Sequence, residues 1–412
     1  MIQQSVDVAV IGAGPAGLAA AVSAKENGAK KVMVLDRNSW QGGILPQCIH
    51  DGFGVEETGK SMTGPEYADM YLKMAEKKNI DFTLETMVLN LNKKLEITAV
   101  NKKGLHKIKC KSLVLAMGCR EKTRWNIMIP GDRPSGIYTA GVAQAFINLY
   151  NIVPGKDIVI LGSGDVGLIM ARRLKFEGAK VHAVVEILPF ASGLPRNVVQ
   201  CLDDYEIPLF LNHTVTNIEG RERLESVTIA QVDEDMDIIP GSERKIKCDT
   251  LLLSLGLIPE NELSRNIGIE IDEITGGPKV DQSFETNVPG FFACGNCLQV
   301  YDTVDVLSVG AKHAGKNAAL KPKKDNSEIL IKPSRGIRYV VPQKVNKSGI
   351  INFTMRTLKP RESVTLRVKA DKKEIFKKKL RWVNPANMVE FNLEINDNLL
   401  KSGKNLEVSI DA

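Results

Sequence analysis

The chain has 412 residues, of which 43% are hydrophobic and 25% charged, a composition typical of a folded globular protein and unlike that of a disordered or collagen-like one. Its length predicts two or three domains, and without a run of about 18 apolar residues no membrane span is expected. The net charge of +6 is uneven, because residues 331–412 carry 18 Lys and Arg against 8 Asp and Glu, whereas residues 1–330 carry 37 against 41. We therefore expect an acidic body followed by a basic domain.

Cysteine usage and the start of the chain suggest a compartment. Seven cysteines are scattered over the sequence, and the first expected strand begins within five residues of Met1. That leaves no space for the basic and apolar parts of a signal peptide. We interpret the cysteines as reduced thiols of a cytoplasmic protein and not as a disulfide framework.

Residues 6–37 predict a strand, a glycine-rich turn, a helix and a second strand. In this turn Gly12 makes the tight bend, Gly14 lets a pyrophosphate reach the backbone, and Gly17 lets the helix pack on the sheet. Anions are favoured at the helix N-terminus by its free N–H groups and its dipole. Asp36 follows Gly17 by 19 residues and can accept hydrogen bonds from a ribose. The segment therefore predicts a dinucleotide site.

The next stretch, GGILPQCIHDGFG at residues 42–54, places Cys48 two residues before His50 in a glycine-rich loop. It is compatible with a redox centre, with half of a metal site, or with a turn that contains a cysteine. An imidazole beside a thiol can stabilise the thiolate or move a proton. In the structural alternative, Cys48 is buried and His50 faces solvent.

Residues 157–187 repeat the strand, turn, helix and strand, and Glu186 again follows the third glycine by 19 residues. The three glycines of the repeat are Gly162, Gly164 and Gly167. Each unit is later followed by an apolar strand that ends at a glycine, at 112–121 and at 250–261. Two units of equal spacing predict two dinucleotide sites. A carboxylate at Glu186 pairs with ribose hydroxyls and repels a 2′-phosphate, which favours NAD over NADP.

The end of the chain has a different pattern. Polar residues 326–336 predict a linker, and residues 337–412 contain six short alternating segments typical of a small all-β sandwich. The Lys-rich segment 377–381 fits either a protected edge strand or a docking surface. No motif that reads nucleic acid is present.

These motifs, together with the segment at 285–319, occur in the order found in the two-dinucleotide-domain flavoproteins, and residues 1 to about 325 resemble the pyridine nucleotide-disulfide oxidoreductase superfamily. The resemblance implies an α/β fold with two Rossmann-like domains, the first for FAD and the second, inserted one for NAD. The expected domains are 1–118 and 257–325 for FAD, 119–256 for NAD, a linker at 326–336, and the β-sandwich at 337–412.

Segment 285–319 resembles the second flavin motif of that superfamily, in which a strand ends in Gly-Asp before a helix. Here the pair is Gly295 and Asn296, so a hydrogen bond to a ribityl hydroxyl is kept without the charge. Asp302, shortly after, fits a proton shuttle or a helix cap equally well.

The residues expected to bind the cofactors belong to these motifs. For FAD they are Gly12, Gly14, Pro15, Ala16, Gly17, Asp36, Arg37, Gly42, Gly43, Ala116, Gly118, Gly295, Asn296 and Asp302, and for NAD they are Gly162, Gly164, Asp165, Val166, Gly167, Glu186 and Gly256.

Cys294 and Cys297 form a C-x-x-C pair at the end of the strand in the flavin motif. A single pair lacks the four ligands that zinc or an iron–sulfur cluster requires, and no metal is expected. The dithiol spacings of thioredoxin reductases and of glutathione-reductase-like enzymes are absent from the sequence, which argues against a dithiol reductase. We interpret Cys294 and Cys297 as structural thiols.

Three stretches, QGGILPQCIHDGFG, GCREKTRWNIMIPGDRPSGIYTAG and GNCLQVYDTVDVLS, together resemble a narrower group of bacterial FAD/NAD oxidoreductases. They also resemble the FAD/NAD-binding subunits of amine- and opine-oxidising complexes and of hydrogen cyanide synthase. That group is associated with a glycerol-3-phosphate dehydrogenase-type flavoprotein and a small cysteine-containing protein. The resemblance implies that Cys48 and His50 face the flavin as catalytic residues.

The expected function is an oxidoreductase that exchanges hydride between NAD(H) and FAD and electrons with a partner protein, as a subunit of a glycerol-3-phosphate dehydrogenase-like complex. One alternative is a stand-alone NADH oxidase or peroxidase that cycles Cys48 through a sulfenic acid. A non-enzymatic alternative is an NADH-responsive interaction protein with structural FAD. A homo-oligomer is compatible with each of these.

Overall fold

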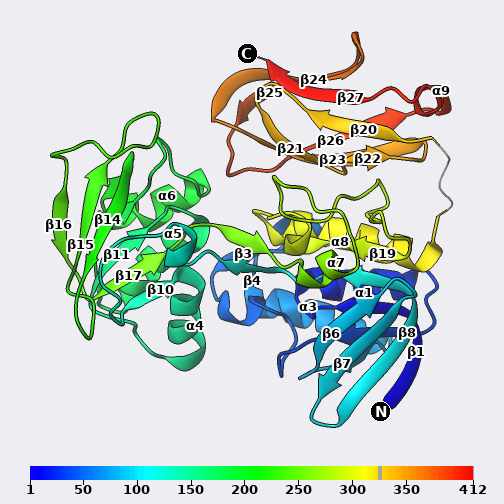
Figure 1. Ribbon diagram of the computed structural model, residues 1–412, viewed down its shortest axis with the longest axis horizontal. Helices are drawn as coiled ribbons and strands as arrows, with labels where there is room; N and C mark the ends of the chain where they lie inside the picture. Colours follow the sequence, from blue (N-terminus) through cyan, green and yellow to red (C-terminus); the bar gives the residue numbers. More distant parts are fainter. Residues whose placement is uncertain (323–326, 412) are drawn as a thin grey trace. The chain divides into compact units, whose positions relative to one another are not determined.

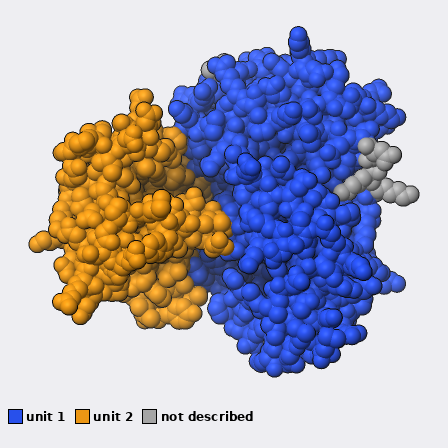
Figure 2. Space-filling model, in the orientation of Figure 1, with its two compact units in different colours: residues 1–119, 259–412 blue, residues 120–258 orange. Residues whose placement is uncertain are grey.

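The computed structural model describes residues 1–322 and 327–411. The chain forms two compact units and passes from one to the other twice. Unit 1 comprises Met1–Cys119 and Pro259–Ala412, and unit 2 comprises Arg120–Ile258 (Figure 2). The crossings lie in β9 (Cys119–Glu121) and β18 (Leu257–Pro259). The inserted unit thus begins and ends within one or two residues of the limits, 119 and 256, that the sequence predicts.

Unit 1 contains a seven-stranded sheet (Figure 1). Its strands follow the order β5 (Asp81–Thr83), β2 (Val32–Leu35), β1 (Ile2–Ile11), β8 (Gly104–Leu115), β7 (Glu96–Asn101) and β6 (Met87–Asn92), and β19 (Phe291–Ala293) pairs with the end of β8. The pairs among β5, β2, β1, β8 and β19 are parallel. All four residues of β2 and the last four of β1 are buried, as expected for central parallel strands covered on both faces.

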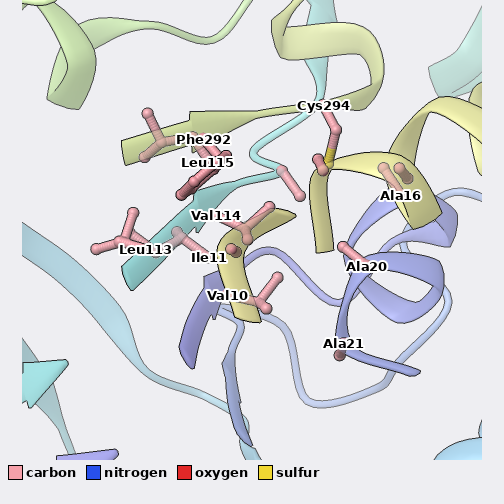
Figure 3. Packing of buried hydrophobic residues seen from close by; sticks show 14 of the residues in the cluster. Val10, Ile11, Ala16, Ala20, Ala21, Leu113, Val114, Leu115, Phe292 and Cys294 are labelled. Carbon is pink, nitrogen blue, oxygen red and sulfur yellow. The ribbon is translucent and has the colours of Figure 1, made fainter. Parts of the chain in front are cut away.

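Two helices of unit 1 pack closely together: α1 (Pro15–Glu26) and α8 (Val304–Leu320). A Cβ on Gly315 of α8 would collide with the carbonyl of Ala20 in α1, so the helices cross with backbone near backbone. Alanines of α1, including Ala16, Ala20 and Ala21, point into the core beside strand residues such as Val10 and Leu115 (Figure 3). Small side chains thus let α1 lie directly on the sheet and under α8.

Four elements lie between β2 and β5. In chain order they are the short strand β3 (Asp51–Phe53), the short helix α2 (Val55–Thr58), the short strand β4 (Met62–Thr63) and the helix α3 (Gly64–Lys77). Thr63 and Glu66 form a capping box at the start of α3, which satisfies two N–H groups of its first turn.

Unit 2 repeats the same topology. Its parallel sheet has the order β10 (Ile137–Thr139), β17 (Thr250–Leu253), β11 (Asp157–Leu161), β12 (Lys180–Val185) and β13 (Leu209–Phe210), with the helices α4 (Ala140–Tyr150), α5 (Asp165–Phe176) and α6 (Pro195–Cys201). An antiparallel sheet of β14 (His213–Glu219), β15 (Ser226–Gln231) and β16 (Arg244–Lys247) accompanies it. The sequence β11-α5-β12 is the counterpart of β1-α1-β2, which confirms the predicted pair of Rossmann-like folds.

The last part of unit 1 is a β-sandwich, as predicted. One sheet has the order β22 (Lys344–Val345), β20 (Ile329–Pro333), β27 (Leu406–Asp411), β24 (Arg361–Ala370) and β25 (Lys373–Val383), and the other has β21 (Ile337–Val341), β23 (Gly349–Thr357) and β26 (Val389–Ile395), with a short α9 (Asp397–Lys401) before β27. Phe353 and Phe391 from one sheet and Leu366 and Val408 from the other are buried in one cluster. The Lys-rich β25 is an edge strand, which fits the protective role of exposed lysines at an edge.

The predicted linker at 326–336 requires a correction. Residue 326 lies outside the described residues, but β20 falls within the rest of the segment. Ile329 and Ile331 are buried while Leu330 and Lys332 are exposed. This alternation of buried and exposed residues is only five residues long and lies among prolines and charged residues, so the sequence alone does not reveal it. The segment forms a strand because it pairs with β27 and β22.

Arg356 of β23 attaches the β-sandwich to residues 299–302, a loop within the flavin-motif segment 285–319. Its guanidinium donates to the carbonyl of Val300 at 3.0 Å and to the carboxylate of Asp302 at 3.4 Å. Nearby, the amide of Gln299 donates to the Thr354 hydroxyl at 2.8 Å. The sandwich therefore packs on the body of its own chain, although charge alone had left docking elsewhere open.

In the part of the chain that the structure describes, none of the helices combines the length and apolar character needed to cross a bilayer.

Replacing Arg356 tests this attachment. Asp302 and Arg356 are 9% and 12% exposed at their side chains, and Arg356→Ala leaves the carboxylate buried without its cation, at a cost of about 3–5 kcal/mol. Thermal unfolding followed by circular dichroism is expected to begin at a clearly lower temperature. Arg381→Ala, at an exposed position on the edge strand, serves as the control and is expected to melt like the original protein. Equal melting of both variants would contradict the attachment.

Candidate functional site

The first glycine turn, between β1 and α1, is held against the end of β8. Gly12 has φ +106°, a conformation that favours glycine, and a Cβ there would collide with the carbonyl of Ala116. A Cβ on Gly17 would in turn collide with the carbonyl of Gly12. Strand, turn and helix therefore approach one another at distances that admit no side chain, as the sequence predicts.

The N-terminus of α1 is bare and closely surrounded. Gly14 is its N-cap residue, Pro15 follows, and no side chain caps the N-terminus. A Cβ on Gly43 would lie 2.8 Å from the Cα of Gly14, and a Cβ on Gly295 would lie 2.5 Å from the Cβ of Ala16. Two loops far apart in sequence thus bring backbone, and not side chains, to this helix end. The arrangement suits a pyrophosphate.

Asp36 stands beside this turn. Its Oδ2 accepts a hydrogen bond from the N–H of Ala13 at 2.7 Å, and its Oδ1 accepts one from the N–H of Asn38 at 2.8 Å. The side chain is partly exposed and the neighbouring Arg37 is exposed. A carboxylate oxygen can accept more than one hydrogen bond, so Asp36 retains capacity for ribose hydroxyls.

Unit 2 contains a second turn of the same construction. Gly162 has φ +92° and a Cβ there would collide with the carbonyl of Ser254, while a Cβ on Gly167 would lie 2.6 Å from the Ser254 Cβ. Gly164 is the N-cap residue of α5, and Asp165 begins the helix. Val166, the next predicted contact, is partly exposed in the first turn of α5.

Glu186 repeats the backbone contacts of Asp36. Its Oε2 accepts from the N–H of Ser163 and its Oε1 accepts from the N–H of Leu188, both at 3.0 Å. In each unit the acid therefore bonds the residue after the first glycine and the residue two places after itself. Unlike Asp36, Glu186 is only 4% exposed.

A glycine of left-handed conformation follows three residues after the end of β8 and three residues after the end of β17. Gly118 has φ +71° and Gly256 has φ +89°, and a Cβ on either would meet no atom within 4 Å. Ala116, two residues before Gly118, is buried against the first turn. The two glycines leave open space where a cofactor is predicted to approach the backbone.

Asn296 and Asp302 differ in their surroundings. The Oδ1 of Asn296 accepts from the N–H of Tyr301 at 3.1 Å, and its amide nitrogen lies 3.6 Å from the sulfur of Cys119. These contacts orient the amide, which stays a predicted flavin contact. The oxygens of Asp302 instead bond Arg356 and the N–H of Met388. The β-sandwich thus bonds both oxygens of this carboxylate, and a cofactor contact at Asp302 stays a prediction.

Cys48 follows a single turn of 3-10 helix at residues Leu45–Gln47. Its sulfur donates to the carbonyl of Ile44 at 3.4 Å, and its own carbonyl accepts from the N–H of Gly64 at 2.8 Å. Burial raises the pKa of the Cys48 thiol to about 12. In this conformation the thiol is protonated at neutral pH and is not a ready nucleophile.

His50 lies two residues further along the same loop. Its Nδ1 is 3.2 Å from the carbonyl oxygen of Asp51, and its ring centroid is 5.0 Å from that of Phe53. The ring is partly exposed, as suits a residue that exchanges protons with solvent or a ligand.

A partly buried polar network beneath this loop was not predicted from the sequence. The hydroxyls of Tyr67 and Tyr71 donate to the two oxygens of Glu57 at 2.6 and 2.7 Å, and Lys312 of α8 forms an ion pair with Glu57. Although burial opposes it, the hydrogen bonds of Lys312 and the tyrosines hold the pKa of Glu57 below its usual value. Asp305 accepts the N–H of Glu57 at 3.1 Å. The only sequence signal for this network is the pair of tyrosines four residues apart, which lie on one face of α3.

Cys294 and Cys297 are fully buried. The sulfur of Cys297 donates to the carbonyl of Leu115 at 3.1 Å, and burial raises the pKa of both thiols, that of Cys297 to about 11. Over residues 1–322 and 327–411, no group of three or more His, Cys, Asp or Glu side chains is arranged to hold a metal ion. These contacts fit the interpretation of both cysteines as structural thiols.

The two dinucleotide turns follow the order of the flavoprotein motifs, and a comparison with models of protein families gives the same result. Residues 6–314 match the model of the pyridine nucleotide-disulphide oxidoreductases. The chain belongs to this family. Its members are oxidoreductases that use FAD and NAD(P)H, which confirms the predicted enzyme class and the predicted pair of cofactors.

Curated relatives of this oxidoreductase include components of larger enzymes. The HcnB subunit of the hydrogen cyanide synthase of Pseudomonas protegens is 24% identical over 289 residues, which are 65% of this chain and 60% of that protein. A subunit of the alkyl hydroperoxide reductase of Staphylococcus aureus is 27% identical over 321 residues, 76% of this chain and 58% of that protein. The chain thus spans about three-fifths of the length of these relatives.

Solved structures share the fold. A thioredoxin reductase of T. acidophilum superposes with a TM-score of 0.63 at 22% identity, over 77% of this chain and 98% of that one. An NAD-dependent persulfide reductase from A. fulgidus superposes with a TM-score of 0.59 at 18% identity, over 94% of this chain and 71% of that one. At these identities the likeness is one of fold alone.

The residues of the first turn fit FAD. The α1 N-terminus lacks a side-chain cap, which leaves N–H groups for the pyrophosphate, and Asp36 has acceptor capacity for the ribose. Gly43 and Gly295 keep the surrounding loops free of side chains where these would meet the turn.

The raised pKa of Cys48 is open to a direct test. Because only the thiolate reacts with iodoacetamide, alkylation of Cys48 is expected to be slow at pH 7 and to accelerate about tenfold per pH unit up to pH 10. Peptide mass spectrometry after short exposures measures the rate at this residue. The urea-unfolded protein is the control, and its rate is expected to level off near the ordinary thiol pKa of about 8.5. A plateau by pH 9 in the folded protein would contradict burial of the sulfur.

Proposed function

We propose that this oxidoreductase exchanges hydride between NAD(H) in unit 2 and FAD in unit 1, and electrons between the flavin and a partner protein. The observation that carries the proposal is the duplicated dinucleotide turn, with an acid bonded in the same way to the backbone of each turn. When bound, FAD accepts a hydride from NADH and passes electrons on to an acceptor.

In this proposal the residues of the chain bind the two dinucleotides and orient them. The α1 and α5 N-termini receive the two pyrophosphates, and Asp36 and Glu186 stand at the adenosine riboses. Gly42 and Gly43 bring the Cys48 loop to the first turn, since the N–H of Gly42 donates to the carbonyl of Ala13 at 2.8 Å. In this proposal Cys48 and His50 lie on the flavin side of that loop and act in transfer to the acceptor.

The proposed partner rests on resemblance. Two relatives are named as subunits, which supports work within an assembly. The narrower motif resemblance favours a complex with a glycerol-3-phosphate dehydrogenase-type flavoprotein and a small cysteine-containing protein.

The peroxidase alternative is less favoured by the Cys48 environment. Sulfenic acid chemistry begins from a thiolate, whereas burial raises the pKa of Cys48 to about 12. A protonated thiol can donate a hydrogen bond, and we propose that role for Cys48.

Nucleotide preference tests the assignment of unit 2. NADH is expected to reduce the flavin about 100-fold faster than NADPH, because a 2′-phosphate beside the buried carboxylate of Glu186 costs about 3 kcal/mol. Anaerobic stopped-flow absorbance at the flavin band measures both rates. Rates within a factor of three of each other would refute the preference for NAD, and no bleaching by either nucleotide would favour the NADH-responsive interaction protein.

The Cys48→Ala variant, which removes the S–H donor, tests the proposed role of the loop. It is expected to retain FAD and to be reduced by NADH at a near-normal rate, while transfer to the acceptor falls at least tenfold. Cys110→Ala is the matched control, since the Cys110 sulfur also donates to a backbone carbonyl at 3.4 Å and burial also raises its pKa to about 12. Turnover equal to that of the Cys110 variant with every acceptor would return Cys48 to a structural role.

A further inference from the structure

The acid of the second dinucleotide turn is covered by two serines. Besides the N–H of Ser163, the Oε2 of Glu186 accepts hydrogen bonds from the hydroxyl of Ser163 and, at 3.0 Å, from the hydroxyl of Ser192. Ser163 is fully buried and Glu186 is 4% exposed. Asp36, which makes the same backbone contacts in unit 1, is partly exposed. The two units therefore differ in how much of the acid is left for a ribose.

Ser192 belongs to a segment, residues 187–197, that lies folded on the turn. Its N–H donates to the Ser163 hydroxyl at 2.8 Å. A Cβ on Gly193 would lie 2.8 Å from the Ser163 carbonyl oxygen, so the segment approaches the turn closely. We refer to residues 187–197 as the closing segment.

The other end of the closing segment is fastened to Asp165. The N–H of Leu194 and the side-chain amide of Asn197 donate to its Oδ1 at 2.8 and 2.6 Å. Asp165 is the first residue of α5. The carboxylates of Glu186 and Asp165 therefore both hold the closing segment. Ser192 itself is exposed, and its hydroxyl can leave Glu186 without disturbing a packed core.

We propose that Ser192 lowers the affinity of unit 2 for its dinucleotide, because its hydroxyl competes with a ribose hydroxyl for a carboxylate that already accepts hydrogen bonds from Ser163 and Leu188. The nucleotide then binds by exchanging the Ser192 hydroxyl for its own, and the closing segment loosens from Ser163 as this happens. The inference rests on the proposed function, in which unit 2 binds NAD(H).

The energetic consequence is specific. Replacing one hydroxyl on a carboxylate by another leaves the number of hydrogen bonds unchanged, so the ribose gains little in the original protein. Without the Ser192 hydroxyl, the ribose supplies a bond that is otherwise missing, and a hydrogen bond to a charged group contributes measurably to affinity. If Ser192 only fastened the closing segment, its loss would instead leave affinity unchanged or reduce it.

Calorimetric titration of the FAD-loaded full chain with NADH tests the inference. Ser192→Ala is expected to bind NADH about tenfold more tightly, and Ser192→Thr, which keeps a hydroxyl, is expected to bind as the original protein does. The matched control is Ser226→Ala, which removes a hydroxyl bonded at 3.3 Å to the carboxylate of Glu219 in the same unit, and its affinity is expected to stay the same. Equal or weaker binding by Ser192→Ala would overturn the inference and leave the proposed function standing.

Hydrogen exchange gives a readout that does not depend on turnover. The N–H groups of Ser192 and Leu194 are bonded in the free protein, and exchange at Ser192 is expected to accelerate when NADH saturates the chain, while most of unit 2 exchanges more slowly. Slower exchange at Ser192 would overturn the inference. If neither the original protein nor Ser192→Ala binds NADH, the proposed function fails and the inference fails with it.

Discussion

The close approach of a backbone turn to the end of a neighbouring strand is the constraint on which the rest of this structure depends. Gly12 lies against the carbonyl of Ala116 and Gly162 against the carbonyl of Ser254, both with a left-handed φ and no room for a Cβ. These contacts place a helix N-terminus at the carboxyl end of the sheet, where a phosphate is favoured. The acid after the second strand then accepts a hydrogen bond from the N–H of the residue that follows the first glycine of the turn, in both units.

Around the first turn, loops distant in sequence are held by polar contacts beneath the surface. Asp305 at the start of α8 accepts the N–H of Glu57, and Lys312, two turns further along the same helix, pairs with the carboxylate of Glu57. The Cys48 loop is therefore joined at one end to the glycine turn and at the other to the helix that follows the flavin motif. Its geometry is determined by a network that burial makes costly to break.

The β-sandwich extends this arrangement from the other side. Arg356 bonds the backbone of Val300 and the carboxylate of Asp302, and Tyr301 between them donates its N–H to Asn296. A short chain of hydrogen bonds thus joins the sandwich to the flavin motif. The basic charge that distinguishes residues 331–412 lies largely elsewhere, on strands such as β25 at the edge of the sheet, where exposed lysines discourage pairing with other chains.

The sequence by itself determined the two Rossmann-like units, their order, the paired acids and the β-sandwich. These features depend on local spacing, since a glycine turn, an apolar strand and an acid 19 residues on interact within one supersecondary unit. The tertiary structure decided what depends on distant partners. Asp302 is bonded by Arg356, 54 residues away. The strand β20 forms because β27 and β22 pair with it. Glu186 is covered by Ser192, whereas Asp36 stays partly exposed. Hydrogen-bond partners brought together by folding leave no periodic pattern in a single chain, and for that reason only the fold could assign them.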